Sequence, residues 1–146
     1  MSQPTSHVIA IDGPSGAGKS TVARALGRRL KFLHVDSGAL YRLVTWQALR
    51  KGIACEDSAA LADLARDLTI EVFTREGAVG CRIEGTEPGE GLRSPQINAG
   101  VSPVSRVPAV RTRVTDCLRG MQALGDLVVE GRDIGSVVFP DSPARF

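Results

Sequence analysis

The segment "IAIDGPSGAGKSTVARAL", Ile9–Leu26, passes from an apolar stretch through a glycine-rich turn into a helical pattern. Gly13, four further residues and then Gly18, Lys19 and Ser20 fit the pattern G-x-x-x-x-G-K-[ST]. Glycines let the backbone curl with its N–H groups turned inward, and the helix start adds a positive dipole end. The segment therefore predicts a strand, a loop that holds the phosphates of a nucleotide, and a helix.

Each part of this loop has an expected role in binding the phosphates of ATP or GTP with Mg²⁺. Lys19 is expected to reach the β- and γ-phosphates, and the Ser20 hydroxyl to help hold the metal ion. The alternative is a tight strand-to-helix turn that binds nothing. The chain has no N-K-x-D sequence for reading guanine, which favours a small kinase over a GTPase. The pattern covers Gly13, Pro14, Ser15, Gly16, Ala17, Gly18, Lys19 and Ser20, and Thr21 follows it.

The rest of the chain alternates between strand and helix patterns, which predicts an α/β fold with a parallel sheet and helices on both faces. Alternation across Thr69–Gly85 predicts an antiparallel hairpin that turns at Arg75–Gly77, and Thr86–Gln96 is expected to be a loop. The expected strands are His7–Ile11, Phe32–Val35, one from Leu127 and a stub at Ala144–Phe146. The expected helices are Lys19–Leu30, Ser37–Lys51, Ser58–Leu68 capped by Asp57 or Ser58, and Pro108–Leu124.

Helical spacing of apolar residues predicts which side chains face the core. On the first helix these are Val22, Ala25, Leu26 and Leu30. On the second they are Tyr41, Val44 and Leu49.

Composition restricts the class of protein. A chain of 146 residues with 42% apolar residues suits one globular domain, and a net charge of +2 argues against a protein that coats nucleic acid. Three cysteines far apart suggest neither a disulfide framework nor a zinc site. We expect a cytoplasmic protein without a secretory signal, a membrane span or a nucleic-acid partner.

Polar residues follow the predicted strands at the edge where ligands of such sheets bind. Asp36 and Ser37 follow the second strand, and Arg132 and Asp133 follow the strand from Leu127. Ser37 alone could equally be a helix cap, and Arg42 in the next helix a solvated arginine. Glu130 could steer Mg²⁺-bound water or be an acid on the surface at the end of a strand.

Four segments together carry a family resemblance: "IDGPSGAGKST", "DSGALYR", "VSPVSRVPAVR" and "EGRDIGSVVFPDSPARF". They look like the corresponding parts of the bacterial cytidylate (CMP/dCMP) kinases, from about Val8 to the last residue. The resemblance implies transfer of the γ-phosphoryl group of ATP to CMP or dCMP, with Mg²⁺. It also implies a CMP-binding insertion at about residues 65–110, which would include the hairpin.

The resemblance also assigns roles to single residues, and it implies that the loop from Gly13 to Thr21 holds the phosphates of ATP. Lys19 and Arg132 would act on the transferred phosphoryl group. The CMP phosphate would be held by Ser37, Arg42 and Arg132, and the cytosine edge would be read by Ser102, Arg111 and Asp133. A monomer is expected.

Members of this family continue beyond the point that matches Phe146, with the rest of a fourth parallel strand, an arginine-rich lid and a final strand. We therefore expect this sequence to be C-terminally truncated relative to them. Two alternatives stay open: a non-catalytic nucleotide-binding fragment, and a P-loop kinase for another small acceptor.

Overall fold

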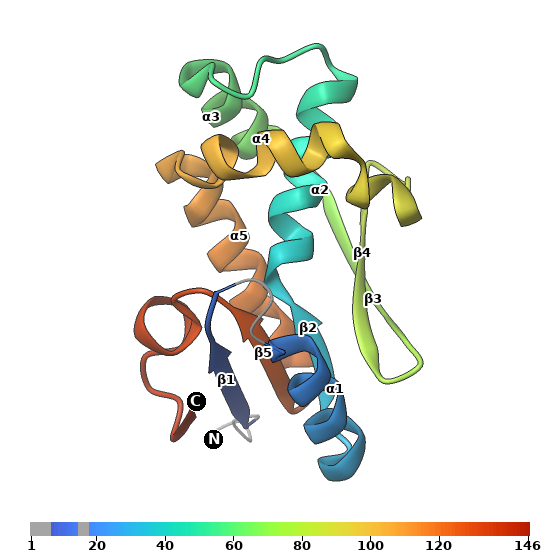
Figure 1. The fold of residues 1–146 in the computed structure, drawn as a ribbon, viewed down its shortest axis with the longest axis vertical. Helices are drawn as coiled ribbons and strands as arrows, with labels where there is room; N and C mark the ends of the chain where they lie inside the picture. The colour runs from blue at the N-terminus through green and yellow to red at the C-terminus, as the bar shows by residue number, and fades with distance from the viewer. Residues whose placement is uncertain (1–6, 15–17) are drawn as a thin grey trace. The chain divides into compact units, whose positions relative to one another are not determined.

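The computed structural model describes residues 7–14 and 18–146, which form two compact units (Figure 1). Unit 1 comprises the described residues of Met1–Ser37, Val72–Gly80 and Leu118–Phe146. Unit 2 comprises Gly38–Glu71 and Cys81–Cys117. None of the helices in the described residues is long and apolar enough to cross a membrane.

The sheet has six strands in the order β3-β4-β2-β5-β1-β6, and the rest of the chain is largely helical, which confirms the α/β class. Its centre is parallel: β1 (Val8–Asp12) and β2 (Leu33–Asp36) flank β5 (Leu127–Gly131). The short strand β6 (Ala144–Arg145) pairs with β1, also in parallel. These four elements confirm the three expected strands and the expected stub. All residues of β5 are buried, as a strand inside a parallel sheet requires.

Helix α1 (Lys19–Leu30) has the predicted bounds but faces the sheet with other residues. Its buried positions are Ala23 and Gly27, and Ala23 packs with Ile11 and Val128. Small residues are needed because the helix lies close to its neighbours; a β-carbon on Gly27 would lie 3.0 Å from the Phe32 carbonyl oxygen.

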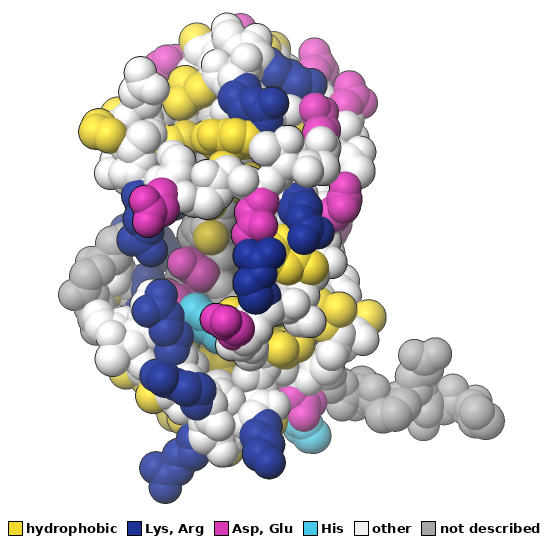
Figure 2. Space-filling view, turned by 90° about the vertical axis from the view of Figure 1, so that its right-hand side faces the viewer, with side chains coloured by type: hydrophobic (Ala, Val, Ile, Leu, Met, Phe, Trp, Pro, Cys, Tyr) yellow, Lys and Arg dark blue, Asp and Glu magenta, His cyan; other side chains and the backbone are white. Residues whose placement is uncertain are grey.

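The predicted inward set on α1 is therefore partly wrong. Leu26 is half-buried against the core, but Val22 and Leu30 are 51% and 44% exposed, and Ala25 is exposed. The exposed arginines of α1 are Arg24, Arg28 and Arg29. Figure 2 shows several Lys and Arg side chains on the lower part of the face that it draws.

The predicted hairpin is present as β3 (Ile70–Arg75) and β4 (Ala78–Ile83). Its two turn residues, Glu76 and Gly77, both have positive φ, at 51° and 79°, as the tightest hairpin turns require. The sequence did not predict that β4 extends the main sheet. His34 of β2 is paired in parallel with Ala78, and its N–H donates to the Gly77 carbonyl oxygen at 3.0 Å.

Unit 2 contains most of the helices: α2 (Ser37–Arg50, whose first residue belongs to unit 1), α3 (Ser58–Asp67), α4 (Pro95–Ser105) and most of α5 (Pro108–Gly120). The cap of α3 is confirmed, because the Asp57 side chain accepts from Ala60 N at 3.1 Å. On α2, Val44 is buried as predicted and Tyr41 is half-buried, whereas Leu49 is 38% exposed, contrary to prediction.

The expected loop before α5 is wrong, because helix α4 and a 3-10 helix (Gly89–Arg93) occupy much of it. Ser94 caps α4 by accepting from Ile97 N at 3.3 Å, and Pro95 takes the first helical position, where its missing N–H costs nothing. The C-terminal end of the predicted Pro108–Leu124 helix also differs. The α-helix stops at Gly120, and Met121–Leu124 form a 3-10 turn.

Trp46, the only tryptophan in the sequence, lies on α2 in unit 2. The Arg50 guanidinium lies 4.3 Å from the centre of its ring, and a β-carbon on Gly91 would lie 3.5 Å from its Nε1. The indole is thus held between its own helix and the Gly89–Arg93 turn.

Candidate nucleotide-binding site

The two ends of the predicted phosphate loop are fixed where β1 stops and α1 begins. Gly13 N donates to the Gly131 carbonyl oxygen at 3.2 Å, which ties the start of the loop to the end of β5. Gly18 precedes the helix with a φ of 79°, a conformation that glycine adopts without strain. The predicted loop residues Ser15, Gly16 and Ala17 lie outside the described residues.

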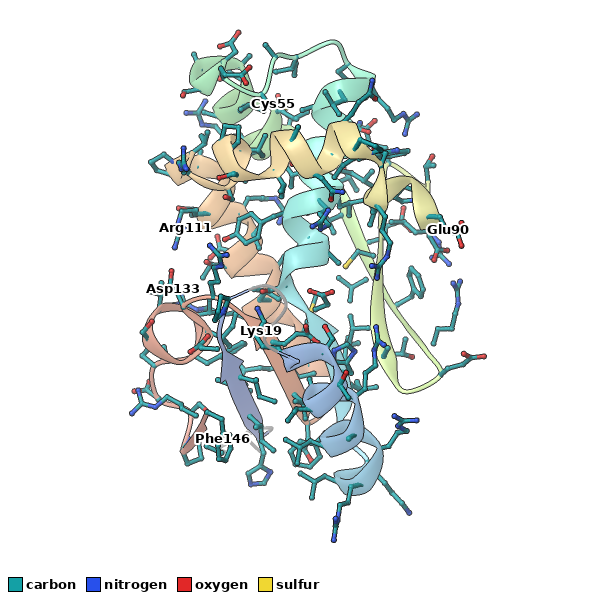
Figure 3. The ribbon with its side chains drawn as sticks, in the orientation of Figure 1. Lys19, Cys55, Glu90, Arg111, Asp133 and Phe146 are labelled. Atoms are coloured by element: carbon teal, nitrogen blue, oxygen red, sulfur yellow. The ribbon has the colours of Figure 1, made fainter. Side chains whose placement is uncertain are left out.

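Lys19, the first residue of α1, bridges the loop. Its Nζ donates to the Gly13 carbonyl oxygen at 2.5 Å. Figure 3 shows Lys19 and Asp133 at the same end of the unit 1 sheet, where β1 and β5 stop. A cation beside the first backbone amides of a helix is a favourable place for phosphate oxygens. Of the other predicted loop residues, Pro14 and Thr21 are exposed and Gly13 is half-buried.

Next to the loop, a buried carboxylate receives two hydrogen bonds. Glu130, the fourth residue of β5, is 3% exposed, so the alternative of a surface acid is wrong. Its Oε1 accepts from Ser20 Oγ at 2.5 Å, and its Oε2 lies 2.5 Å from His34 Nε2. Sequence reasoning did not include His34, because its place beside Glu130 follows from the pairing of β2 with β5.

The Ser20 hydroxyl and the Glu130 carboxylate suit Mg²⁺, which prefers oxygen ligands and usually keeps several waters beside substrate phosphates. Ser20 would hold the ion directly, and Glu130 would hold a water bound to it. Among the described residues no cluster of three or more His, Cys, Asp or Glu side chains forms a metal site. A site built from one hydroxyl, one carboxylate and the nucleotide's own phosphates fits this composition.

Ser37 and Gly131 bring together two of the segments expected to hold the acceptor. Ser37 begins α2 and is 3% exposed. A β-carbon on Gly131 would lie 1.9 Å from Ser37 Oγ, so this position has no room for a side chain. Arg132 and Asp133, which follow Gly131, are both exposed.

Asp12 holds the segment after β5 in place. Its Oδ1 accepts from Ile134 N at 2.6 Å, and its Oδ2 accepts from Gly135 N at 2.9 Å. Arg145 Nη1 donates to the Gly135 carbonyl oxygen at 3.0 Å. Sequence reasoning missed Asp12, although a carboxylate directly before the loop glycine was the available signal. Through these bonds the end of β1 fixes the turn that carries Arg132 and Asp133.

The remaining candidates, Arg42, Ser102 and Arg111, belong to unit 2. Arg42 Nη1 donates to Asn98 Oδ1 and, at 3.3 Å, to the Leu92 carbonyl oxygen, so Arg42 is anchored rather than simply solvated. Ser102 is exposed on α4, and its carbonyl oxygen accepts from Ser105 Oγ at 2.9 Å. Arg111 is exposed on α5 (Figure 3).

Comparison with known proteins identifies the family of the chain. The family described as cytidylate kinase matches residues 9–146. The cytidylate kinase of Pelotomaculum thermopropionicum is 48% identical over 138 residues, which are 94% of this chain and 61% of that protein. The cytidylate kinase of Symbiobacterium thermophilum is 46% identical, over 95% of this chain and 62% of that protein.

A longer relative also matches. The bifunctional pantoate ligase/cytidylate kinase of a Synechococcus species is 45% identical over 99% of this chain and 27% of its own length. Of the relatives that are named cytidylate kinase alone, the chain spans about 60% of the length.

Proposed function

The chain belongs to the cytidylate kinase family, and from this premise we propose that it transfers the γ-phosphoryl group of ATP to CMP or dCMP. The products would be ADP and CDP or dCDP. The observation that carries the proposal is the cluster at the start of α1, in which Lys19 and Ser20 lie beside the buried carboxylate of Glu130. We further propose that it acts in the cytoplasm as a monomer, with no nucleic-acid or membrane partner.

Phosphoryl transfer depends mainly on positioning and on neutralising charge, and the residues of unit 1 suit both tasks. Lys19 exchanges its bond to the Gly13 carbonyl oxygen for the β- and γ-phosphate oxygens of ATP. Ser20 donates to Glu130, and its hydroxyl oxygen would be a ligand of the metal ion. Mg²⁺, when bound, neutralises negative charge on the β- and γ-phosphates.

The acceptor is proposed to be held by its phosphate and read by its base. Ser37, Arg42 and Arg132 would bind the CMP phosphate through a hydroxyl and two guanidinium groups, which match phosphate oxygens well. Arg132 would also stabilise the phosphoryl group during transfer.

Ser102, Arg111 and Asp133 would bind the cytosine edge. A carboxylate such as Asp133 accepts from the amino group of cytosine and repels the carbonyl oxygen that uracil has at the same ring position. An unpaired buried polar group costs about 1–3 kcal/mol, which corresponds to a preference for CMP over UMP of roughly five- to 150-fold.

The test couples ADP release to each acceptor in turn: CMP, dCMP, UMP, AMP and shikimate, with ATP and Mg²⁺. We expect turnover with CMP and dCMP and little with the others, and Asp133→Ala should lose the preference for CMP over UMP. Preference for another acceptor would reassign the substrate. ATP binding without ADP formation from any acceptor would instead support a non-catalytic nucleotide-binding role.

A further inference from the structure

His34 is a buried imidazole that the expected chemistry of the site does not use. It lies on β2, its side chain is 11% exposed, and its Nε2 lies 2.5 Å from Glu130 Oε2. A carboxylate only accepts hydrogen bonds, so the tautomer of His34 that can bond to Glu130 is the one with its proton on Nε2. In this form the imidazole donates a hydrogen bond to Glu130, the same carboxylate that accepts from Ser20.

The register of the sheet explains why these three side chains meet. Asp36 is paired with Glu130, and paired residues of parallel strands point to the same face. His34, two residues before Asp36, points to that face as well. On the other side of β5, Glu130 is paired with Ile11 of β1, and Ile11 packs with Ala23 of α1. Helix α1 therefore covers this face and brings Ser20 to it.

The two hydrogen bonds fix how the carboxylate is turned. Ser20 donates to Oε1 and His34 to Oε2, so each oxygen of Glu130 has one donor. Without His34, Oε2 would be a buried charged oxygen lacking this donor, which is costly, and the carboxylate would be free to turn away from Ser20.

We propose that His34 is a positioning residue for the metal-bound nucleotide. By holding Oε2, it keeps Oε1 as the acceptor of the Ser20 hydroxyl proton, so that the lone pairs of Ser20 Oγ stay available to Mg²⁺. This inference rests on the proposed nucleotide site. It adds a residue of β2 to a site that otherwise consists of residues at the start of α1 and the end of β5.

The experiment measures ATP affinity by calorimetry, once with Mg²⁺ and once with EDTA, for the wild type and three variants. His34→Leu removes the donor, His34→Gln keeps an N–H donor, and His7→Leu is a control in an exposed side chain. In the presence of Mg²⁺, we expect His34→Leu to bind ATP about tenfold more weakly than the wild type does. In EDTA, the two proteins should bind ATP equally well. His34→Gln should recover most of the ATP affinity that His34→Leu loses in Mg²⁺, and His7→Leu should behave as wild type.

A spectroscopic readout follows the imidazole itself. The sequence has two histidines, so ¹⁵N spectra of the rings resolve His7 and His34. We expect the Nε2–H form for His34 and a shift of its signal, but not that of His7, when Mg²⁺ and ATP are added together. If His34→Leu does not fold, the ATP affinities of His34→Gln and these spectra test the proposal in its place.

Three outcomes are distinguishable. An undiminished Mg²⁺ gain in His34→Leu, or a His34 signal that ignores Mg²⁺ and ATP, overturns the inference. Equal loss in His34→Leu and His34→Gln together with a lowered Tm also overturns it, because His34 then acts by packing. If the wild type binds no ATP, the proposed function itself fails.

Discussion

Gly131 packs directly against the hydroxyl of Ser37: a β-carbon built on Gly131 would lie 1.9 Å from Ser37 Oγ. The contact joins the last residue of β5 to the first residue of α2. Both positions lead into segments with expected acceptor-binding residues, and the lack of a side chain at residue 131 leaves room for the Ser37 hydroxyl.

Gly131→Ala should therefore destabilise the protein by about 1–3 kcal/mol, because the added methyl group has no space and the glycine φ of 158° is strained for alanine. Gly120→Ala is the matched control, since a β-carbon there meets nothing within 4 Å. It should stay within about 1 kcal/mol of the wild type, on the stabilising side. Denaturant unfolding measures both, and equal stability of the two variants would contradict the close contact.

Asp12→Ala should lower the free energy of unfolding by about 1–3 kcal/mol, because the N–H groups of Ile134 and Gly135 lose their acceptors. Asp12→Asn keeps one acceptor oxygen and should lose less. Amide hydrogen exchange at residues 134 and 135 should be faster in both. Asp63→Ala, which breaks an exposed pair with Arg66, is the control and should change stability by no more than about 1 kcal/mol.

Lys19→Met should weaken binding of ATP by at least about tenfold, because a charge-assisted contact to the phosphates is lost. The rise in Tm on adding ATP and Mg²⁺ reports this affinity, since a ligand that binds only the folded state stabilises it more when its Kd is lower. Lys51→Met, at an exposed lysine paired with Glu84, should keep the full rise. A normal ATP-dependent rise in Lys19→Met would contradict the assignment of the loop.

Cys117 should react with iodoacetamide at a lower pH than Cys81 or Cys55. A hydrogen bond between the thiols lowers the pKa of Cys117 and raises that of Cys81. Burial opposes the first shift, and the nearby Arg113 reinforces it. Burial also raises the pKa of Cys55. Since the thiolate is the reactive form, a lower pKa means alkylation at lower pH.

Peptide mass spectrometry over a pH series of about 6 to 9 gives the order of labelling. Arg113→Gln should move labelling of Cys117 to higher pH, because a favourable positive charge is removed. Labelling of Cys81 ahead of Cys117 would rule out the expected direction of the thiol hydrogen bond.

Asn98→Asp should raise the KM for CMP by roughly three- to tenfold and leave the KM for ATP unchanged. The new carboxylate would neutralise the Arg42 guanidinium, which Asn98 contacts and which is proposed to bind the CMP phosphate. Asn98→Ala removes the contact without adding charge and should have a smaller effect. Equal changes in the KM for CMP and the KM for ATP would contradict the proposed contact between Arg42 and the CMP phosphate.

The elements with strong local signals were predictable from the sequence. The bounds of α1 follow from the glycine-rich turn and the lysine, and the hairpin follows from alternation around Glu76 and Gly77. The inward face of α1 was not predictable by counting large apolar residues, because Ala23 and Gly27 face the sheet. Helix α4 was missed because Gly100 and Pro103 weaken its pattern, although Ser94 and Pro95 mark its start.

For the site, residues within one segment were predictable and contacts across segments were not. Lys19 and Ser20 are consecutive and belong to a known pattern. His34 and Glu130 are 96 positions apart in sequence, and Asp12 and Ile134 are 122 apart. Contacts of this kind depend on which strands are neighbours and in what register, and a single sequence contains no local signal for either.

The position of Trp46 has a practical consequence. As the only indole of the chain, it belongs to unit 2, so intrinsic fluorescence reports the state of that unit and unit 1 emits no tryptophan signal. Far-ultraviolet circular dichroism, in contrast, sums the backbone of both units. A denaturation curve that differs between the two methods would reveal that the units melt in separate steps.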